Sequence, residues 1–351
     1  TELTPFLAAA VARGAGAATM EASSHALAQD RLAGLRFDVA AFTNLSRDHL
    51  DYHRTFEEYF AAKARLFDLL KPGGRAVINA DDSYGRRLIE RLPPDVVLAT
   101  SLDGRAACEL SAEAEFGERG VVLRCRRAST GERFDIRSPL LGRPNAENLL
   151  TAAAAALAGG LAAKDVADAL GAVSRVPGRL EPVPCGRGFS VLVDYAHKPA
   201  ALEGVLKTVR ALAARSGGRV LVVFGCGGDR DRGKRPEMGA IAARLADLVF
   251  VTSDNPRSEA PEAILADIRA GVEAARGAAR YDVDRRAAVA TALSEARPGD
   301  VVLIAGKGHE TSQTIGGVSH PFDDRKVARE LLAAAGDAVA AAAASGGAAP
   351  A

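Results

Sequence analysis

The order of apolar and polar stretches along the chain predicts a mostly parallel sheet in its first half. Ala15 to Met20 and Val39 to Phe42 are short apolar runs that each end in polar residues, as expected of buried strands. Two further strands are predicted over Arg75 to Asp82 and Val96 to Ala99. Between residues 105 and 138 the sequence alternates and is rich in charge, which favours antiparallel strands.

Two helices are predicted beside these strands. Phe56 to Leu70 has apolar residues at helical spacing, and Lys63 occupies a position on the apolar face of that stripe. The sequence from Leu141 to Asn148 opens an alanine-rich helix that runs to about Leu157. An asparagine at such a place, here Asn145, is commonly a helix cap. A lysine on the core face is unusual, so Lys63 is a candidate for chemistry rather than packing.

The second half alternates regularly between strand and helix. Strands are predicted in FSVLVDY, RVLVVFGCGG, LVFVTSDN and VVLIAGKGHE, and helices over 200–215, 238–246, 261–275 and 326–335. Such alternation predicts an α/β fold with a Rossmann-like, doubly wound parallel sheet. Proline and glycine within Val176 to Glu181 indicate a boundary between domains 1–176 and 177–335. Residues 336–351 are almost all Ala, Gly and Ser and are expected to form a disordered tail.

Composition narrows the classes of function. The chain has 351 residues, enough for two domains, and its net charge of +1 gives no sign of a nucleic-acid or membrane-surface partner. The longest apolar tract, Thr151 to Ala163, is too short to span a bilayer. The four cysteines show no metal-binding spacing and fit free thiols in a reducing cytoplasm. Small molecules are therefore the expected partners, and the oligomeric state is left open.

Three residues that carry chemistry are expected together at one edge of the first sheet. Glu21 follows the first predicted strand, His49 follows the second, and Lys63 lies on the next helix. An unpaired ammonium is costly to bury, and a metal or phosphate site would explain all three residues. Each also has a simpler interpretation. Lys63 extends its ammonium to water, Glu21 is a solvated strand end, and His49 is a packed or surface histidine.

Each of the four predicted strands of the second domain ends in a polar cluster. The clusters are DYAHK from Asp194, GCGGDRDRGKR from Gly225, SDNPR from Ser253 and GKGHE from Gly306. Their position on one rim of a parallel sheet predicts a binding crevice. The run GCGGD lacks the GxGxxG spacing of a dinucleotide site, and the mixed charges behind it suit a zwitterionic ligand better.

The strings MEASSHAL, TNLSRDHLDYH and AAKARLF resemble the central-domain signatures of the Mur ligases, ATP-dependent amide ligases that extend the peptide of the peptidoglycan precursor. The resemblance implies that Glu21 and His49 bind Mg²⁺. It also implies that Lys63 is carbamylated, which would turn this side chain into a carboxylate that helps to hold a second Mg²⁺. By the same likeness, the UDP-muramoyl dipeptide contacts Ser23, Gln29 and Arg31, and ATP contacts Asn145, Arg179 and Asp194.

The second domain narrows this resemblance. DYAHKPAAL, GCGGDRDRGKRPEM, DNPR and GKGHE are similar to the signatures of Mur ligases that add the third residue of the stem peptide. DNPR is the form associated with meso-diaminopimelate. The implied reaction joins meso-diaminopimelate to the D-glutamate of UDP-N-acetylmuramoyl-L-Ala-D-Glu through an acyl phosphate. Arg230 and Arg257 would bind the extra carboxylate of this amino acid, and Asp254 and Glu310 its distal ammonium. The remaining implied contacts are Asn255, Pro256 and Gly306.

One motif expected for this chemistry is not in the sequence. A GxxxxGK[ST] loop normally cradles the β and γ phosphates, whereas Gly233-Lys234 is followed by Arg235 and Gly306-Lys307 by Gly308. The family likeness places this loop before Thr1, so the chain is expected to be a truncated ligase that is inactive alone. Two alternatives are a folylpolyglutamate synthase-like ligase, which should lack DNPR, and a non-catalytic binding protein that keeps the amino-acid crevice.

Overall fold

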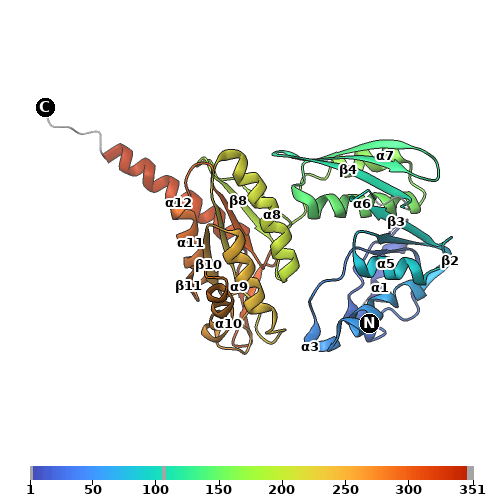
Figure 1. Cartoon of the computed structure of the whole chain (residues 1–351), viewed down its shortest axis with the longest axis horizontal. Helices are drawn as coiled ribbons and strands as arrows, with labels where there is room; N and C mark the ends of the chain where they lie inside the picture. Colours follow the sequence, from blue (N-terminus) through green and yellow to red (C-terminus); the bar gives the residue numbers. More distant parts are fainter. Residues whose placement is uncertain (1–2, 105–107, 346–351) are drawn as a thin grey trace.

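Two six-stranded sheets, one in each half of the chain, organise the structure (Figure 1). The computed structural model describes residues 3–104 and 108–345, with side chains described as far as residue 334. The strands of the first sheet are β1 (Phe37–Phe42), β2 (Leu70–Asn79), β3 (Val97–Ser101), β4 (Leu110–Gly117), β5 (Gly120–Arg127) and β6 (Arg133–Ser138). They pair in sequence order, parallel from β1 to β4 and antiparallel from β4 to β6. The predicted antiparallel strands are confirmed, and residues 105–107 lie outside the described part.

Helices of the first domain cover both faces of its sheet. The described helices of this domain are α1 (Leu3–Ala12), α2 (Ser24–Ala28), α3 (Leu50–His53), α4 (Phe56–Ala64), α5 (Ser83–Arg91), α6 (Gly142–Ala158) and α7 (Ala163–Gly171), and α4, α5, α6 and α7 contribute to its cores. On one face the alanine-rich α6 buries Leu149 and Leu150 against Val77 of β2. On the other face, α4 and α5 pack against Ile78, because neighbouring residues of a strand point to opposite sides.

The helix predicted over Phe56 to Leu70 is shorter than expected. Helix α4 ends at Ala64, a 3₁₀ turn covers Phe67–Leu69, and Leu70 already begins β2. Phe67 and Leu70 still pack on the same core as α4. The apolar pattern therefore continues past the end of the helix, since it reports burial and not helix length.

The strand predicted over Ala15 to Met20 is wrong. Residues 15–23 have no regular secondary structure, and every residue from 15 to 20 is exposed. Among the described residues β1 pairs only with β2, so this segment has no partner strand. Alanine and glycine are also weak strand formers, and Gly14 adopts φ +85° just before the segment. An apolar run becomes a buried strand only where a neighbouring strand receives its hydrogen bonds.

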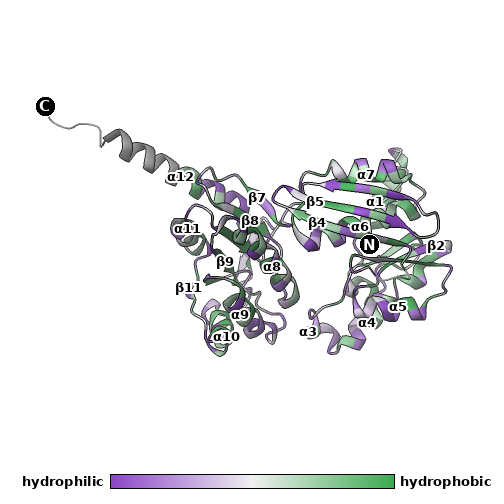
Figure 2. Ribbon diagram, turned by 45° about the horizontal axis from the view of Figure 1, so that its top comes forward, coloured by the Kyte–Doolittle hydropathy of each residue, from purple (hydrophilic) through white to green (hydrophobic). Residues whose placement is uncertain are grey.

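The second sheet is the doubly wound sheet that the sequence predicts. Its strands are β7 (Glu181–Val183), β8 (Ser190–Asp194), β9 (Val220–Phe224), β10 (Leu248–Thr252), β11 (Arg280–Asp282) and β12 (Val301–Ala305), in the order β11-β10-β9-β12-β8-β7. All pairs are parallel except that of β7 with β8. Figure 2 shows β8 and β9 in green, the colour of hydrophobic residues, which fits strands that are covered on both faces.

Five helices flank the second sheet, on opposite sides. They are α8 (Pro199–Ser216), α9 (Lys234–Leu245), α10 (Pro261–Ala274), α11 (Arg285–Glu295) and α12 (Asp324–Ser345). Helices α8, α9 and α10 contribute to one core, and α11 and α12 to the other. Helix α11, strand β11 and the hairpin β13 (Ser312–Ile315) with β14 (Val318–Pro321) were not predicted from the sequence.

The end of the described chain differs from its prediction. Helix α12 continues to Ser345, so the predicted disordered tail is wrong for residues 336–345. Alanine has the highest helix propensity, which favours continuation of a helix that has already started. Residues 346–351 lie outside the described part. No helix in the described ranges has the length and the apolar character needed to cross a membrane.

The segment that joins the two halves runs from α7 to β7 and includes the predicted boundary at Val176 to Glu181. Gly178 adopts φ +68°, and a Cβ added there would lie 2.2 Å from the backbone nitrogen of His309. Glu181 Oε2 accepts the N–H of Gly178 at 2.8 Å. The joining segment is therefore packed directly against the GKGHE loop of the second domain.

Candidate functional site

The four polar clusters predicted for the second domain lie at the carboxyl ends of β8, β9, β12 and β10. These strands are parallel neighbours in the sheet, so their carboxyl ends share one rim. The clusters begin at Asp194, Gly225, Gly306 and Ser253, each within one residue of a strand end. The structure thus brings to one rim four clusters that are spread over more than one hundred residues of sequence.

Two arginines meet at the glycine turn after β9. A Cβ added at Gly227 would lie 2.8 Å from Nη1 of Arg257 and 3.8 Å from Cγ of Arg230. Arg257 adopts φ +54° and donates from Nη1 to the carbonyl of Gly228 at 2.6 Å, and its own N–H donates to the carbonyl of Thr314 at 3.0 Å. The hairpin β13–β14 therefore holds Arg257 in its strained backbone conformation. Two guanidinium groups at one turn are suited to a carboxylate ligand.

The predicted acidic contacts form a network with a residue that the sequence analysis did not select, Lys307. Its ammonium is fully buried and lies 2.9 Å from Oε2 of Glu310 and 3.2 Å from Oδ1 of Asn255. Asn255 Nδ2 also donates to Oε2 of Glu310 at 2.8 Å. Pro256 is buried beside this network, where its carbonyl accepts the N–H of Glu259 at 3.1 Å. Asp254 and Glu310, which are predicted to bind the ammonium of a ligand, therefore already lie around the buried ammonium of Lys307.

Buried arginines hold the loops of this rim, and sequence reasoning missed their role. Arg285 of α11 pairs with Asp324 at 2.7 Å, and neither side chain has any exposure. It also donates to the carbonyls of Ser253 at 3.2 Å and Ala305 at 2.9 Å, the residues just before Asp254 and Gly306. Arg285 thereby fixes two strand ends that carry predicted ligand contacts. The sequence could have indicated this role only if helix α11 had been predicted, because Arg285 then stands out as a charged residue on its apolar face.

Arg235 holds the glycine-rich loop in a similar way. Its guanidinium is fully buried, makes two hydrogen bonds with Glu259 at 2.7 and 2.9 Å, and donates to Asp267 at 2.9 Å. It also donates to the carbonyl of Gly227 at 3.1 Å. The Arg235 hydrogen bonds outweigh burial and lower the pKa of Glu259 to about 2. The position of Gly227, and with it the two site arginines, depends on this pair.

Glu21 is close enough to Lys63 for their charges to interact, but no hydrogen bond or ion pair joins Glu21, His49 and Lys63 in the described part of the first domain. In the described part of the chain, no group of three His, Cys, Asp or Glu side chains is placed to hold a metal ion. Lys63 is partly buried, and its Nζ lies 5.2 Å from the centre of the Tyr59 ring. Burial lowers the pKa of Lys63, helped by the charge of Lys198, while Glu21 and Asp48 act in the opposite direction. Glu21 itself is exposed, because the segment that carries it is outside the sheet.

The chemistry of these donors nevertheless fits a Mg²⁺ site. Burial lowers the pKa of His49 to about 4, so its imidazole is neutral at physiological pH and has a lone pair for a metal. The lowered pKa of Lys63 favours the uncharged amine that carbamylation requires. With that modification, the donors would be two carboxylate groups and one imidazole. Oxygen ligands of this kind suit Mg²⁺.

Asp48, beside His49, joins the two domains. Its carboxylate is buried and lies 3.0 Å from Nζ of Lys198 and 3.9 Å from Nζ of Lys234, both in the second domain. Although burial alone raises the pKa of Asp48, His197 and the two lysines hold it well below its usual range. Arg47 also pairs with Asp231 across the same interface at 2.9 Å. In the sequence, only the position of Arg47 and Asp48 inside the motif TNLSRDHLDYH indicated that they have a role.

The residues predicted for the UDP-muramoyl dipeptide lie around α2. Ser23 is the helix cap and accepts the N–H of Ala26 at 3.2 Å, and Gln29 donates to the hydroxyl of Tyr52 at 3.2 Å. Gln29 and Arg31 are exposed. Their substrate role stays a prediction, which their exposure permits.

The residues predicted for ATP have different internal roles. Leu141 is the cap of α6, so Asn145 is not, and its amide donates instead to the carbonyl of Leu141 at 2.9 Å. Asp194 accepts the N–H of Leu180 and of Ala196, both at 2.8 Å, and burial raises its pKa. Arg179 is exposed, with its guanidinium 5.2 Å from the centre of the Tyr195 ring. Asp194 thus fixes the end of the joining segment, and its contact with ATP stays a prediction.

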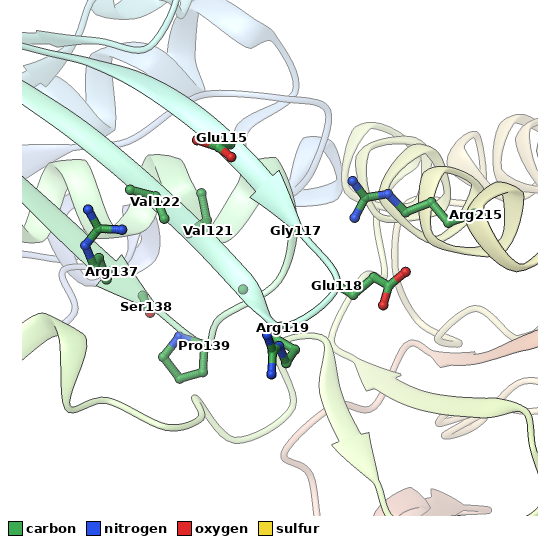
Figure 3. Close-up of a pocket in the computed structure, with 11 residues that line it drawn as sticks. Glu115, Gly117, Glu118, Arg119, Val121, Val122, Arg137, Ser138, Pro139 and Arg215 are labelled. Atoms are coloured by element: carbon green, nitrogen blue, oxygen red, sulfur yellow. The ribbon is translucent and has the colours of Figure 1, made fainter.

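One hollow in the described part of the structure lies away from all of these residues. It has a volume of about 800 Å³ and lies between the β4–β5 turn, β6 and the end of α8 (Figure 3). Arg215 points toward this turn from α8 in Figure 3, and it donates to the carbonyl of Phe116 at 3.5 Å. The lining arginines are exposed, and none of the described lining residues has a buried side-chain nitrogen or oxygen without a hydrogen-bond partner. The rim of the second sheet remains the candidate site.

Family profiles match both domains of the chain. The Mur ligase middle domain matches residues 1–156, and the Mur ligase, glutamate ligase domain matches residues 178–308. The chain belongs to the Mur ligase family. This assignment agrees with the fold, the polar rim and the resemblance of its motifs.

Several curated relatives of this Mur ligase share one name, UDP-N-acetylmuramoyl-L-alanyl-D-glutamate–2,6-diaminopimelate ligase. The protein of Synechococcus elongatus is 50% identical over 335 residues, which are 95% of this chain and 66% of that protein. The protein of Trichormus variabilis is 48% identical, and the match covers 95% of this chain and 68% of that protein. The chain therefore spans about two thirds of the length of these relatives.

Solved structures give the same picture. A structure of a UDP-N-acetylmuramoyl-L-alanyl-D-glutamate–2,6-diaminopimelate ligase is 40% identical with a TM-score of 0.58, and the match covers 92% of this Mur ligase and 66% of that chain. A folylpolyglutamate synthase of Mycobacterium tuberculosis is 22% identical with a TM-score of 0.62, covering 84% of this chain and 64% of that one. At 22% identity, the similarity to the folylpolyglutamate synthase shows a shared fold and nothing about function.

Proposed function

We propose that this Mur ligase joins meso-diaminopimelate to the D-glutamate of UDP-N-acetylmuramoyl-L-Ala-D-Glu in the synthesis of the peptidoglycan precursor, at the expense of ATP. The observation that carries the proposal is the rim of the second sheet, where Arg230 and Arg257 meet beside the acidic residues Asp254 and Glu310. The names of relatives that are 48–50% identical over nearly the whole chain support it.

The proposed reaction has two steps. The D-glutamate carboxylate attacks the γ-phosphorus of ATP, and the bond to the β-phosphate oxygen breaks to leave ADP and an acyl phosphate. The neutral amine of diaminopimelate then attacks the acyl carbon, and a tetrahedral intermediate forms. Phosphate departs with its bonding electron pair, the nitrogen loses a proton, and an amide remains.

The rim residues select and orient the amino acid in this scheme. Arg230 and Arg257 bind the distal carboxylate, which L-lysine does not have, and Asp254 and Glu310 bind the distal ammonium. The interface made by Asp48 with Lys198 and Lys234 holds this rim against the loop that carries His49. The amine of the bound amino acid is thereby kept on the side of the first domain.

We further propose that Glu21, His49 and carbamylated Lys63 hold Mg²⁺. When bound, the metal would offset negative charge between the phosphate and the acceptor carboxylate. The neutral imidazole of His49 and the low pKa of Lys63 support this assignment. We also propose a cytoplasmic location, which the free thiols of Cys125, Cys185 and Cys226 support.

The test combines turnover with binding. The 351-residue chain is given ATP, Mg²⁺, the UDP-muramoyl dipeptide and either meso-diaminopimelate or L-lysine, and phosphate release and the mass of the peptide product are measured. Calorimetric titrations with each amino acid are run on the same preparation. We expect tighter binding of meso-diaminopimelate than of L-lysine, and any product to form with meso-diaminopimelate only.

The outcomes separate the proposal from its alternative. Product with meso-diaminopimelate would exclude a protein that binds the amino acid without catalysis, and selective binding of meso-diaminopimelate without product would support the proposed specificity alone. Equal binding of both amino acids, or none of either, would contradict the proposed specificity.

A further inference from the structure

Lys307 is a fully buried cation in the loop after β12. Its side chain has no exposure, and the glycines on either side, Gly306 and Gly308, adopt φ +114° and +52°. A buried ammonium is costly unless anionic or polar oxygens surround it. Here these oxygens belong to Glu310 at 2.9 Å, Asn255 at 3.2 Å and Asp254 at 3.7 Å. All three are predicted contacts of the amino-acid ligand.

The two carboxylates around Lys307 keep unused hydrogen-bonding capacity. Oδ1 of Asp254 is buried and faces the ammonium of Lys307 at 3.7 Å, but it accepts no hydrogen bond from any described residue, and the Asp254 side chain is only 7% exposed. In Glu310, Oε2 accepts the donors of both Lys307 and Asn255. The Glu310 side chain is 32% exposed, so it also reaches the open side of the rim. Hydrogen-bonding capacity on the Asp254 carboxylate is therefore left for a ligand donor or for a closer approach of Lys307.

The charges at this place match one class of ligand. Asp254 and Glu310 carry two negative charges, and Lys307 cancels one of them, so a single negative charge remains for a ligand ammonium. Arg257 and Arg230 supply positive charge on the neighbouring turn for a carboxylate. The acidic residues and the arginines together suit a ligand in which one carbon atom bears both an ammonium and a carboxylate, such as the distal end of meso-diaminopimelate.

We propose that Lys307 is a positioning and specificity-determining residue of this site, which orients Asp254 and Glu310 and limits their charge to the equivalent of one ligand ammonium. This inference rests on the proposed function. Without Lys307 the two carboxylates would carry two uncompensated charges, which favour a ligand with a bare ammonium over one that adds a carboxylate. Lys307 therefore contributes to the preference for meso-diaminopimelate over L-lysine.

The pKa of Glu310 is consistent with this role. Burial raises it, but the hydrogen bonds from Lys307 and Asn255 outweigh burial and keep the pKa below its usual range. The carboxylate thus stays ionised at the pH at which the ligand ammonium is present. Loss of Lys307 should raise the pKa of Glu310, and ligand binding should then weaken at a higher pH than in the wild type as the pH is lowered.

The experiment compares four forms of the 351-residue chain by calorimetric titration with meso-diaminopimelate and with L-lysine. The forms are the wild type, Lys307→Met, Lys307→Arg and the control Lys326→Met, which changes an exposed lysine of the same domain. We expect Lys307→Met to reduce the affinity ratio of meso-diaminopimelate to L-lysine by about tenfold or more, and Lys307→Arg to keep part of that ratio. Lys326→Met should match the wild type. The pH dependence of binding is measured for the wild type and Lys307→Met.

A lysine that only supports the loop gives a different result. Lys307→Met would then weaken both ligands in the same proportion and leave the pH dependence unchanged, which would overturn the inference while selective binding by the wild type upheld the proposed function. If the wild type itself shows no preference for meso-diaminopimelate, the proposed function fails and the inference fails with it. Thermal unfolding of each variant shows whether the fold is retained. If Lys307→Met does not fold, Lys307→Arg is used instead, through its affinity ratio of meso-diaminopimelate to L-lysine and the pH dependence of its binding. If both equal those of the wild type, the inference is overturned.

Discussion

The rims of the two sheets differ in how their charged residues are held. On the second sheet, Lys307, Arg235 and Arg285 are fully buried and each is paired with one or more carboxylates. On the first sheet, Glu21 is exposed, and no described residue forms a hydrogen bond or ion pair with the ammonium of Lys63. The rim of the second sheet is therefore fixed before any ligand binds. On the first sheet only His49 of the three predicted metal ligands has a described ion-pair partner, Asp48 at 3.2 Å.

The difference follows from the strands beneath each rim. Four parallel strands carry the loops of the second site, and buried ion pairs tie those loops to α9, α11 and α12. Glu21 instead follows a segment that pairs with no described strand. A rim becomes preorganised only where the sheet below it supplies backbone hydrogen bonds and a covered core.

The largest expected effect tests the buried framework of the second rim. Asp324→Ala leaves the guanidinium of Arg285 buried without its carboxylate, which should lower the free energy of unfolding by about 3–5 kcal/mol. The matched control is Glu330→Ala, which breaks an exposed pair with Arg286 and should cost at most about 1 kcal/mol. Urea denaturation measures both. Equal costs would show that burial of the Arg285 pair does not set its importance.

The second prediction concerns the contact between the rims. Asp48→Asn removes the charge that faces Lys198 and Lys234, and Lys234 is almost fully buried. Loss of one partner in such a pair costs about 2–5 kcal/mol, here taken from the docking of the two domains. We expect faster proteolysis of the joining segment near Val176 and a larger radius of gyration by small-angle scattering. Asp51→Asn, at an exposed position in the following helix α3, should leave both unchanged.

A smaller effect with a defined pH dependence is expected at Glu259. Its folded pKa of about 2 lies below its unfolded value near 4.5, so its stabilisation is complete above about pH 4.5 and is lost as the pH falls through about 2. Glu259→Gln weakens two charged hydrogen bonds to Arg235 and should cost about 1.5–3 kcal/mol at neutral pH. The difference from the wild type in urea denaturation should shrink at about pH 3. A difference that stays constant with pH would exclude the charge as its cause.

The smallest expected effect concerns the exposed segment that precedes Glu21 in the first domain. Met20 lies in the segment predicted as a buried strand, but the structure leaves it 37% exposed. Met20→Ser should change the free energy of unfolding by less than about 0.5 kcal/mol, whereas Ile78→Ala in β2 should cost about 2–5 kcal/mol. Thermal or urea unfolding of the two variants decides. A cost above about 1 kcal/mol for Met20→Ser would show that the segment is buried in solution.

The sequence predicted those features that depend on local pattern and on neighbouring strands. The strand and helix alternation after Val176 gave the doubly wound sheet, and the polar clusters at strand ends gave its rim, including Arg257 and Glu310. It missed helix α11 and hairpin β13–β14, and it placed a strand before Glu21 where the structure has none. The false strand shows that an apolar run reports a tendency to be buried and not the presence of a partner.

What the sequence determined by itself was the fold class, the family and the residue types at each strand end, because all of these are written in periodicity and motif. The tertiary structure alone decided which charges meet. Lys307 lies beside Asp254 and Asn255, and Asp48 faces Lys198 and Lys234, although these partners are separated by about fifty to nearly two hundred residues. The energy of a buried charge depends on the atoms within a few ångströms of it, and strand order and domain docking bring those atoms together.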